Sequence, residues 1–202
     1  TSVNNGPAYE VVNDLEVQEI SNRIWLSTTT FLPSQKYGTP VGGRYWYSDD
    51  GNTFTRATPN YPAYPAVNPN NIQRTEIAPS AIDTDTHYIL MRVSGTASGT
   101  IPIIYKTTDN FANLAYIQPP MDVGTDISGS AEPYDFTRGQ SSYDLEIEID
   151  PTSNDIAYVG GINWFRTSNG GNSWDQISKW TSSFYNHNSI GAGVVHADMH
   201  GL

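Results

Sequence analysis

The chain of 202 residues contains no cysteine, few basic residues and no long apolar run. The absence of cysteine excludes disulfide scaffolds and thiolate metal sites. Ten Lys and Arg residues stand against 21 Asp and Glu residues, and the resulting net charge of −11 repels phosphate groups, so we expect no nucleic-acid ligand. No stretch of 18 or more apolar residues is present, so no membrane span is expected.

Composition favours a folded, all-β protein. Hydrophobic residues make up 37% of the chain, which is too much for a disordered acidic segment. Thirteen Tyr, five Trp and seventeen Gly residues favour short strands and tight turns, and no segment shows the apolar spacing of a surface helix. The chain starts at Thr1 and has no signal segment, so we expect it to be a processed or internal piece of a longer protein.

A polar turn motif occurs three times. The segments 47–54 (YSDDGNTF), 106–114 (KTTDNFANL) and 166–174 (RTSNGGNSW) each follow an aromatic or aliphatic stretch and end on a bulky apolar residue. Their first hydroxyl residues, Ser48, Thr107 and Thr167, are 59 and 60 residues apart. Regular self-similarity of this kind predicts a repeat architecture.

The chemistry of these turns predicts a structural role. A short acidic or amide side chain accepts hydrogen bonds from the turn backbone, Gly supplies a positive φ, and the closing apolar residue packs beneath the turn. A catalytic or calcium-binding role for the acidic residues is the minor alternative. The residues expected to form the turns are Ser48, Asp50, Gly51, Phe54, Thr107, Asp109, Thr167, Asn169, Gly170 and Trp174.

A second repeat lies ahead of each turn. Residues 14–18 (DLEVQ) are echoed by 144–148 (DLEIE), and the middle copy reads RTEIAP at 74–79. Each unit then divides into four strands, and radially repeated four-stranded sheets make a β-propeller of about four to eight blades. We therefore predict a partial propeller or fragment, with blades at about 9–58, 72–119 and 142–179 and the first strand of a fourth blade at about 193–202.

Strand order predicts which face of the propeller is the working face. If each inner strand runs from top to bottom, the polar turns lie on the bottom rim, and the long loops that precede the inner strands lie on top. Those loops are aromatic, and loops on a rigid scaffold usually carry binding sites, although the rings could also simply cover the blades. Candidate ligand-binding residues on the top face and inner strands are Tyr61, Tyr64, Tyr134, Trp180, Tyr185, Arg74, Arg138, Glu76 and Glu146.

Acidic residues alternate along the inner strands. Asp14 and Glu16 share one face of the first inner strand, as Asp144 and Glu146 do in the third, and such faces could line a central channel. Asp14, Asp144 and Asp198 are the candidate catalytic residues if the chain is a hydrolase, because a pair of carboxyls about 6.5 to 9.5 Å apart suits inversion at a glycosidic bond.

One short stretch is a weak metal-site candidate. His196, Asp198 and His200 place imidazole and carboxylate groups at strand spacing, but further ligands would have to come from another blade. A structural role for the two histidines is the alternative, and no cofactor is expected.

The turn motifs resemble the Asp-box, or BNR repeat, of sialidase-like and sortilin-like β-propellers. Together with the stretches 150–161, 167–174 and 195–200, they are similar to secreted Asp-box propellers of gliding, polysaccharide-degrading bacteria. The resemblance implies export by type IX secretion and a secreted or cell-surface location. A sialidase would need an arginine cluster on the top face, and this chain has seven Arg residues in all, so that pattern is not met.

These observations together predict a binding protein. We expect a secreted or cell-surface propeller that acts as a glycan- or protein-binding and adhesion module through its top loops. A glycoside hydrolase with paired carboxylates is the alternative, and a cargo or accessory subunit of a secretion or surface assembly is a further one. Expected partners are a glycan or protein ligand and the remaining blades of the same longer chain.

Overall fold

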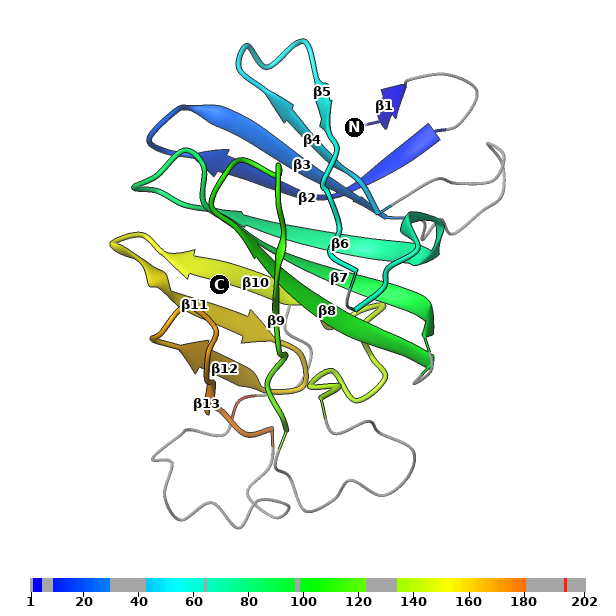
Figure 1. The fold of residues 1–202 in the computed structure, drawn as a ribbon, viewed down its shortest axis with the longest axis vertical. Helices are drawn as coiled ribbons and strands as arrows, with labels where there is room; N and C mark the ends of the chain where they lie inside the picture. Colours follow the sequence, from blue (N-terminus) through cyan, green and yellow to red (C-terminus); the bar gives the residue numbers. More distant parts are fainter. Residues whose placement is uncertain are drawn as a thin grey trace.

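The computed structural model is built from strands. It describes residues 2–4, 9–29, 43–63, 65–96, 99–122, 134–180 and 195. Three antiparallel sheets follow one another along the chain and lie face to face (Figure 1). The all-β, partial-propeller fold expected from the repeats is therefore confirmed, and we refer to the sheets as blades 1, 2 and 3. Within the described residues there is no helix long and apolar enough to cross a membrane.

Blade 1 has five strands in the order β1-β2-β3-β4-β5. Their bounds are β1 Ser2–Asn4, β2 Tyr9–Gln18, β3 Arg23–Thr29, β4 Tyr45–Ser48 and β5 Thr55–Ala57. β1 pairs antiparallel with the first residues of β2, and the sequence patterns did not predict this strand. A register shift between Val12 and Asp14 interrupts the pairing of β2 with β3.

Blades 2 and 3 have four strands each, in sequence order. In blade 2 a 3-10 turn, η2 Pro69–Asn71, leads into β6 Ile72–Pro79, β7 His87–Thr96, β8 Gly99–Thr107 and β9 Ala115–Ile117. Blade 3 comprises β10 Glu146–Asp150, β11 Ser153–Gly160, β12 Trp164–Thr167 and β13 Asp175–Gln176.

The predicted fourth blade lies almost entirely outside the described residues. Val195 is its one described residue, and its backbone N–H donates to the carbonyl of Lys179 at 2.9 Å. The blade boundaries given above stay predictions.

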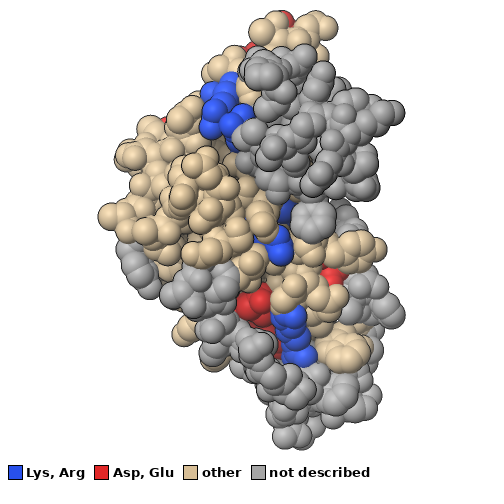
Figure 2. Space-filling view, turned by 90° about the vertical axis from the view of Figure 1, so that its right-hand side faces the viewer, with Lys and Arg blue, Asp and Glu red and all other residues tan. Residues whose placement is uncertain are grey.

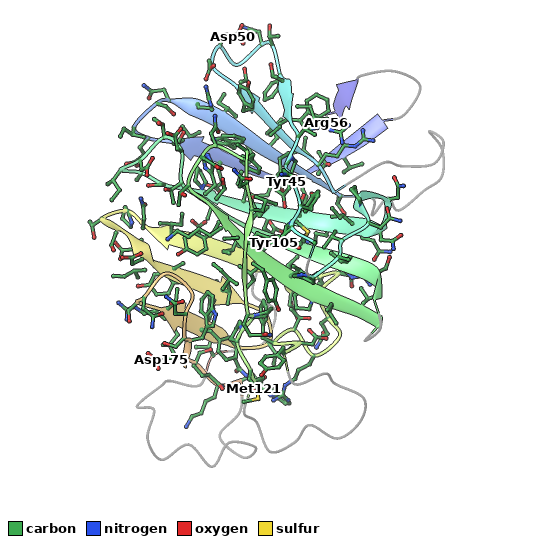
Figure 3. The ribbon with its side chains drawn as sticks, in the orientation of Figure 1. Tyr45, Asp50, Arg56, Tyr105, Met121 and Asp175 are labelled. Atoms are coloured by element: carbon green, nitrogen blue, oxygen red, sulfur yellow. The ribbon has the colours of Figure 1, made fainter. Side chains whose placement is uncertain are left out.

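Two hydrophobic cores hold the blades together. The first lies between blades 1 and 2 and contains Trp25, Tyr45, Ile89 and Tyr105. The second lies between blades 2 and 3 and contains Tyr88, Leu90, Ile147 and Phe165 among others. Figure 3 shows Tyr45 and Tyr105 between the sheets. Because each sheet buries apolar side chains against its neighbour, the interfaces between blades supply the main stabilisation of the fold.

The connections separate into two sides. Figure 1 shows η2 and the β7–β8 connection at the right, whereas the β2–β3 and β10–β11 turns lie at the left. The right-hand side is the top face of the sequence argument, because it carries the connections between second and third strands. It also carries the segments that lead into the inner strands β2, β6 and β10.

Candidate functional site

The first polar turn is closed by its own side chains. Ser48 Oγ accepts a hydrogen bond from the backbone N–H of Gly51 at 2.9 Å. Asp50 Oδ1 accepts from the N–H groups of Asn52 and Thr53 at 2.8 and 2.7 Å, and these bonds hold the pKa of Asp50 below its ordinary value. Gly51 has a φ of +73°, and Asp50 lies at the tip of the turn in Figure 3. Phe54 is half-buried below it.

The other two turns repeat this arrangement. Thr107 Oγ1 accepts from Phe111 N and Asp109 Oδ1 from Asn113 N in blade 2, at 3.1 and 2.8 Å. In blade 3, Thr167 Oγ1 accepts from Gly171 N and Asn169 Oδ1 from Ser173 N, both at 2.9 Å. In the same turn Gly170, at a φ of +70°, donates to Asp155 O, and Trp174 Nε1 donates to Gln118 O. In each of the three turns, a hydroxyl oxygen and a carboxyl or amide oxygen accept hydrogen bonds from backbone N–H groups of the same turn.

The blade 2 turn has no glycine at its positive-φ positions, unlike the turns of blades 1 and 3. Asn110 and Phe111 occupy the positions of Gly170 and Gly171 and have positive φ values of 53° and 72°. Phe111 is only 2% exposed and stacks on Trp25 with 5.1 Å between ring centroids. A bulky residue at positive φ is strained, so the ring contact must offset the cost of the backbone conformation.

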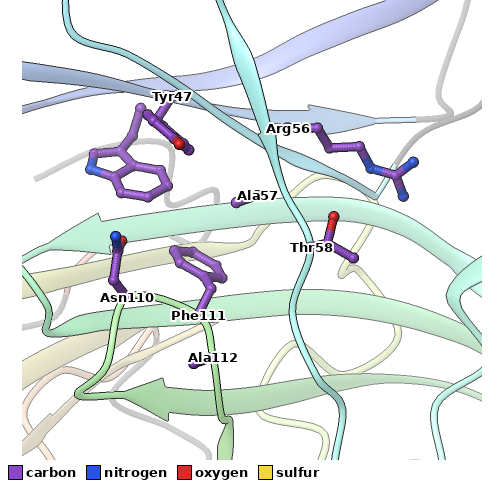
Figure 4. Close-up of a pocket in the computed structure, with 8 residues that line it drawn as sticks. Tyr47, Arg56, Ala57, Thr58, Asn110, Phe111 and Ala112 are labelled. Atoms are coloured by element: carbon purple, nitrogen blue, oxygen red, sulfur yellow. The ribbon is translucent and has the colours of Figure 1, made fainter.

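A pocket of about 250 Å³ lies beside this turn. Tyr47, Arg56 and Thr58 of blade 1 line it together with Asn110 and Phe111 of blade 2 (Figure 4). Arg56, Thr58 and Asn110 are exposed, whereas Phe111 is buried at the base. The pocket therefore combines an exposed polar rim with the rings of Trp25, Tyr47 and Phe111.

Carboxyl groups gather where the three inner strands come together. Asp14 and Glu16 come from β2, Glu76 from β6, and Glu146 and Glu148 from β10. Burial, reinforced by mutual repulsion, raises the pKa of Glu16, Glu146 and Glu148 to about 7 in each case. Burial raises the pKa of Asp14 as well, although a 3.2 Å hydrogen bond from Ile77 N to Asp14 Oδ2 opposes the shift.

Glu76 and Arg74 form a buried pair within this group. Arg74 Nη2 lies 2.7 Å from Glu76 Oε1, and Asn13 Nδ2 donates to the same oxygen at 2.6 Å. Burial nevertheless raises the pKa of Glu76 to about 8, against the effect of Arg74. Arg74 Nε also donates to Glu76 Oε1, at 2.8 Å. Arg74 Nη1 donates to the carbonyls of Ser142 and Tyr143, and Nη2 donates to the carbonyl of Leu145. Arg74, predicted to contact a ligand, thus holds the segment that enters β10.

The candidate catalytic residues differ in their access to solvent. Asp144 has no solvent exposure, so its carboxyl does not reach the surface. Asp14 is partly buried on β2, and Asp198 lies outside the described residues. The inner strands thus bring Asp14 close to Glu16 and Glu146, which interact with it electrostatically.

The aromatic candidates of the top face fall into three groups. Tyr61 packs edge-on against Tyr105 in the first core, and burial raises its pKa above the ordinary value. Trp180 is half-buried, whereas Tyr134 is 48% exposed. Tyr64 and Tyr185 lie outside the described residues.

One exposed aromatic residue was missed by the sequence argument. Tyr143, the residue before Asp144, is 56% exposed. Its position directly ahead of an inner strand places it on the top face, so the strand-order argument could have identified it. Tyr134 and Tyr143 stand at the two ends of residues 134–145, which we call the blade 3 loop.

The blade 3 loop is braced by buried groups. Arg138 Nε lies 2.8 Å from Asp122 Oδ2, and the Asp122 carboxyl is 3% exposed. Asp135 accepts hydrogen bonds from Thr137 N and Gly139 N at 3.1 and 2.8 Å. Phe136 is fully buried in the second core. Arg138, the other arginine predicted to contact a ligand, therefore braces the loop in the same way that Arg74 does.

Among the described residues of the top face, the charged side chains do not form a single patch. Figure 2 shows this side of the molecule, with basic side chains in separate places and acidic ones beside the lowest of them. Met121, 48% exposed, lies near the lower end of the molecule in Figure 3. Within the part of the chain that the structure describes, no group of three His, Asp or Glu residues could hold a metal ion. His196, Asp198 and His200 lie outside that part, so the metal site stays a prediction.

Comparison with known proteins supports the fold alone. No protein-family model matches the chain, and no curated protein matches it either. Among solved structures, the chain is similar to the GH74 enzyme of Niastella koreensis, with 16% identity and a TM-score of 0.54 over 93% of this chain and 24% of that one.

Two further structures show the same likeness. The GH74 xyloglucanase from Xanthomonas campestris has 13% identity and a TM-score of 0.53 over 82% of this chain and 23% of that one. YCF48 from Cyanidioschyzon merolae has 15% identity and a TM-score of 0.52 over 90% of this chain and 44% of that one. All three are β-propeller proteins, and the chain spans from about a quarter to less than half of their lengths.

Proposed function

We propose that the chain is the carbohydrate-binding part of a β-propeller and that the blade 3 loop is its contact surface. Tyr134 and Tyr143 would provide the ring faces. The observation that carries the proposal is that these two tyrosines are 48% and 56% exposed on a loop that is held in place by buried residues.

The loop has the rigidity that such a site needs. Arg74 holds the carbonyls at its end, Arg138 is paired with the buried Asp122, and Phe136 anchors its middle in the core. An aromatic side chain held by a fixed backbone loses little conformational entropy when a ligand binds to it. Two tyrosine side chains that are 48% and 56% exposed on such a braced loop can present their rings to a ligand, which supports a binding role.

The expected ligand is an uncharged polysaccharide. Sugar rings present an apolar C–H face that stacks on tyrosine, and the phenolic hydroxyls can bond to sugar hydroxyls. The net charge of −11 disfavours anionic chains but does not affect neutral ones. Two of the similar structures are GH74 enzymes, one described as a xyloglucanase, which makes xyloglucan a suitable first probe. Such a ligand is extracellular, so the proposal includes a secreted or cell-surface location.

Affinity gel electrophoresis with soluble xyloglucan in the gel tests the proposal. The wild-type protein should be retarded, and the double variant Tyr134→Ala/Tyr143→Ala should lose about tenfold in affinity, from roughly 1.4 kcal/mol of lost ring contact. Tyr134→Phe/Tyr143→Phe keeps the ring faces and should retain most of the binding.

A matched control lies at the other side of the molecule. Ile82, 49% exposed in the turn before β7, can be changed to Ala without touching the top face, and retardation should not change. The proposal is wrong if the double alanine variant binds as tightly as the wild type. The proposal is also wrong if none of xyloglucan, galactomannan and mixed-linkage glucan retards the wild type. If the chain binds a protein ligand and no glycan, protein binding is its function and the carbohydrate proposal is rejected.

Hydrolysis of the bound glycan is the second candidate. It is favoured by Glu16, Glu146 and Glu148, whose raised pKa values of about 7 leave them partly protonated near neutral pH, as a general acid requires. The reducing ends released from xyloglucan should then fall at least a hundredfold in Glu16→Gln/Glu146→Gln. Unchanged release by that variant would remove these residues from the reaction. Membership of the Asp-box family, type IX export and a role in a secretion or surface assembly stay predictions.

A further inference from the structure

We infer that the exposed apolar strip on β2, formed by Leu15, Val17 and the adjacent Ile20, is the docking surface for the first two strands of another blade of the same polypeptide. This inference depends on the packing of the blades and not on the carbohydrate-binding proposal.

The strip is unusual on this molecule. Leu15, Val17 and Ile20 are 55%, 52% and 50% exposed and follow one another along the inner strand and its turn. β1 pairs only with Tyr9 to Val11 and therefore leaves this part of β2 without a strand beside it. Leu26 and Trp46, which lie beside Leu15 on the same face, are 2% exposed, so at this level of the sheet the uncovered area does not extend from β2 to β3 and β4.

The equivalent residues of the other blades are fully buried. Leu15 and Val17 correspond to Thr75 and Ile77 in blade 2 and to Leu145 and Ile147 in blade 3, and these four are 0%, 1%, 0% and 1% exposed. The same repeat position is thus covered twice within the chain and left open once. A half-exposed leucine beside a half-exposed valine is the pattern expected where a repeat unit lacks its neighbour.

Both existing interfaces show what covers these positions. β6 packs against the first two strands of blade 1, β2 and β3, and β10 packs against the first two strands of blade 2, β6 and β7. Above Leu145 and Ile147, the covering residues of the second core include Ala78 of β6 and Tyr88 and Leu90 of β7. Leu15 and Val17 are aliphatic like Leu145 and Ile147. We therefore expect the blade that packs on them to contribute a small residue from its first strand and large apolar residues from its second strand.

The covering strands should come from the same polypeptide. The similar propeller chains are two to four times as long as the part that this chain matches, because it covers only 24%, 23% and 44% of them. A neighbouring blade of the same ring would pack on β2 in the orientation that is already seen between blades 1 and 2 and between blades 2 and 3. A second copy of the chain has no such fixed orientation relative to this strip.

Photo-crosslinking in the protein at its natural length tests the inference. Val17 is replaced by p-benzoyl-phenylalanine, the protein is irradiated, and crosslinked peptides are identified by mass spectrometry. We expect one main intramolecular crosslink from position 17 to a strand outside residues 1–202. The same replacement at Ile82, which is equally exposed in a turn, should give at least tenfold less crosslink.

Other outcomes would overturn the inference. A crosslink to a second copy or to a different protein would assign the strip to another occupant, and absence of crosslinking would show that the strip is solvent-exposed. A stability comparison gives a second reading: Val17→Lys should raise the unfolding equilibrium constant at least tenfold, whereas Ile82→Lys should change it less than about twofold. Equal effects would contradict docking and would leave the carbohydrate proposal untouched.

Discussion

Phe111 allows a sharp test of how the blade 2 turn is held. Its ring is 2% exposed, stacks on Trp25 at 5.1 Å and lies 5.4 Å from Tyr45, yet its φ is +72°. Removing a buried phenylalanine ring costs about 3 to 5 kcal/mol. The left-handed backbone costs an L residue with a Cβ roughly 1 to 2 kcal/mol, which glycine does not incur.

The two effects predict an inverted order of stability. Phe111→Ala should lower the free energy of unfolding by about 4 kcal/mol, because it loses the ring and keeps the strained backbone. Phe111→Gly should lower it by about 3 kcal/mol, although glycine normally costs about 1 kcal/mol more than alanine. In blade 3 the same position is Gly171, with a φ of +90°.

Urea denaturation followed by tryptophan fluorescence measures these differences. Phe165, 1% exposed in β12, serves as the control because its φ is not positive, and there the glycine variant should be the less stable one. If Phe111→Gly is less stable than Phe111→Ala, the strain argument is wrong. If both Phe111 variants fail to fold, the same comparison can be made at Asn110, which also has a positive φ. There Asn110→Gly should be at least as stable as the wild type, and Asn110→Ala should be about 1 kcal/mol less stable.

Three further predictions concern charge. Because burial raises the pKa of the inner-strand glutamates above the ordinary 4.5, the folded state binds more protons than the unfolded state, so the free energy of unfolding should fall as pH rises from about 5 to 8; Glu146→Gln should flatten this slope in denaturation measured across that range. Arg74→Met leaves the 4% exposed carboxyl of Glu76 buried without its arginine partner, and it should lower the free energy of unfolding, measured by urea denaturation, by about 3 kcal/mol. Adding Glu76→Gln to this variant should restore part of the lost stability. Asp50→Ala removes three hydrogen bonds within the turn and should lower the urea midpoint of unfolding. Asp49→Ala breaks only an exposed pair with Arg23 and should lower the midpoint less; equal losses would contradict the turn chemistry.

The repeat pattern predicted the architecture because its signals are local. A hydroxyl, a carboxyl and a glycine at fixed spacing specify a turn through bonds within a few residues, and alternation along 14–18 and 144–148 specifies a strand with two faces. β1 escaped prediction because a three-residue strand has no such pattern, and its pairing with β2 is a tertiary contact.

The roles of individual side chains were harder to predict. Arg74 and Arg138 lie on the expected face, but whether an arginine contacts solvent or a carbonyl depends on which backbone groups lie near it in the fold. The carbonyls of Ser142 to Leu145 are 68 to 71 residues away from Arg74. Likewise, the exposure of Tyr143 beside the fully buried Asp144 depends on the covering blade and not on local sequence.

Hydroxyl-radical footprinting with and without xyloglucan tests the central claim most directly, since it reads the ring faces of the unaltered protein. The account predicts that oxidation of Tyr134 and Tyr143 decreases as xyloglucan is added, while oxidation of Met121 and of partly exposed tyrosines such as Tyr116 and Tyr158 changes little or not at all. Protection that appears only away from the blade 3 loop, or oxidation of Tyr134 and Tyr143 that does not respond to glycan, would contradict it.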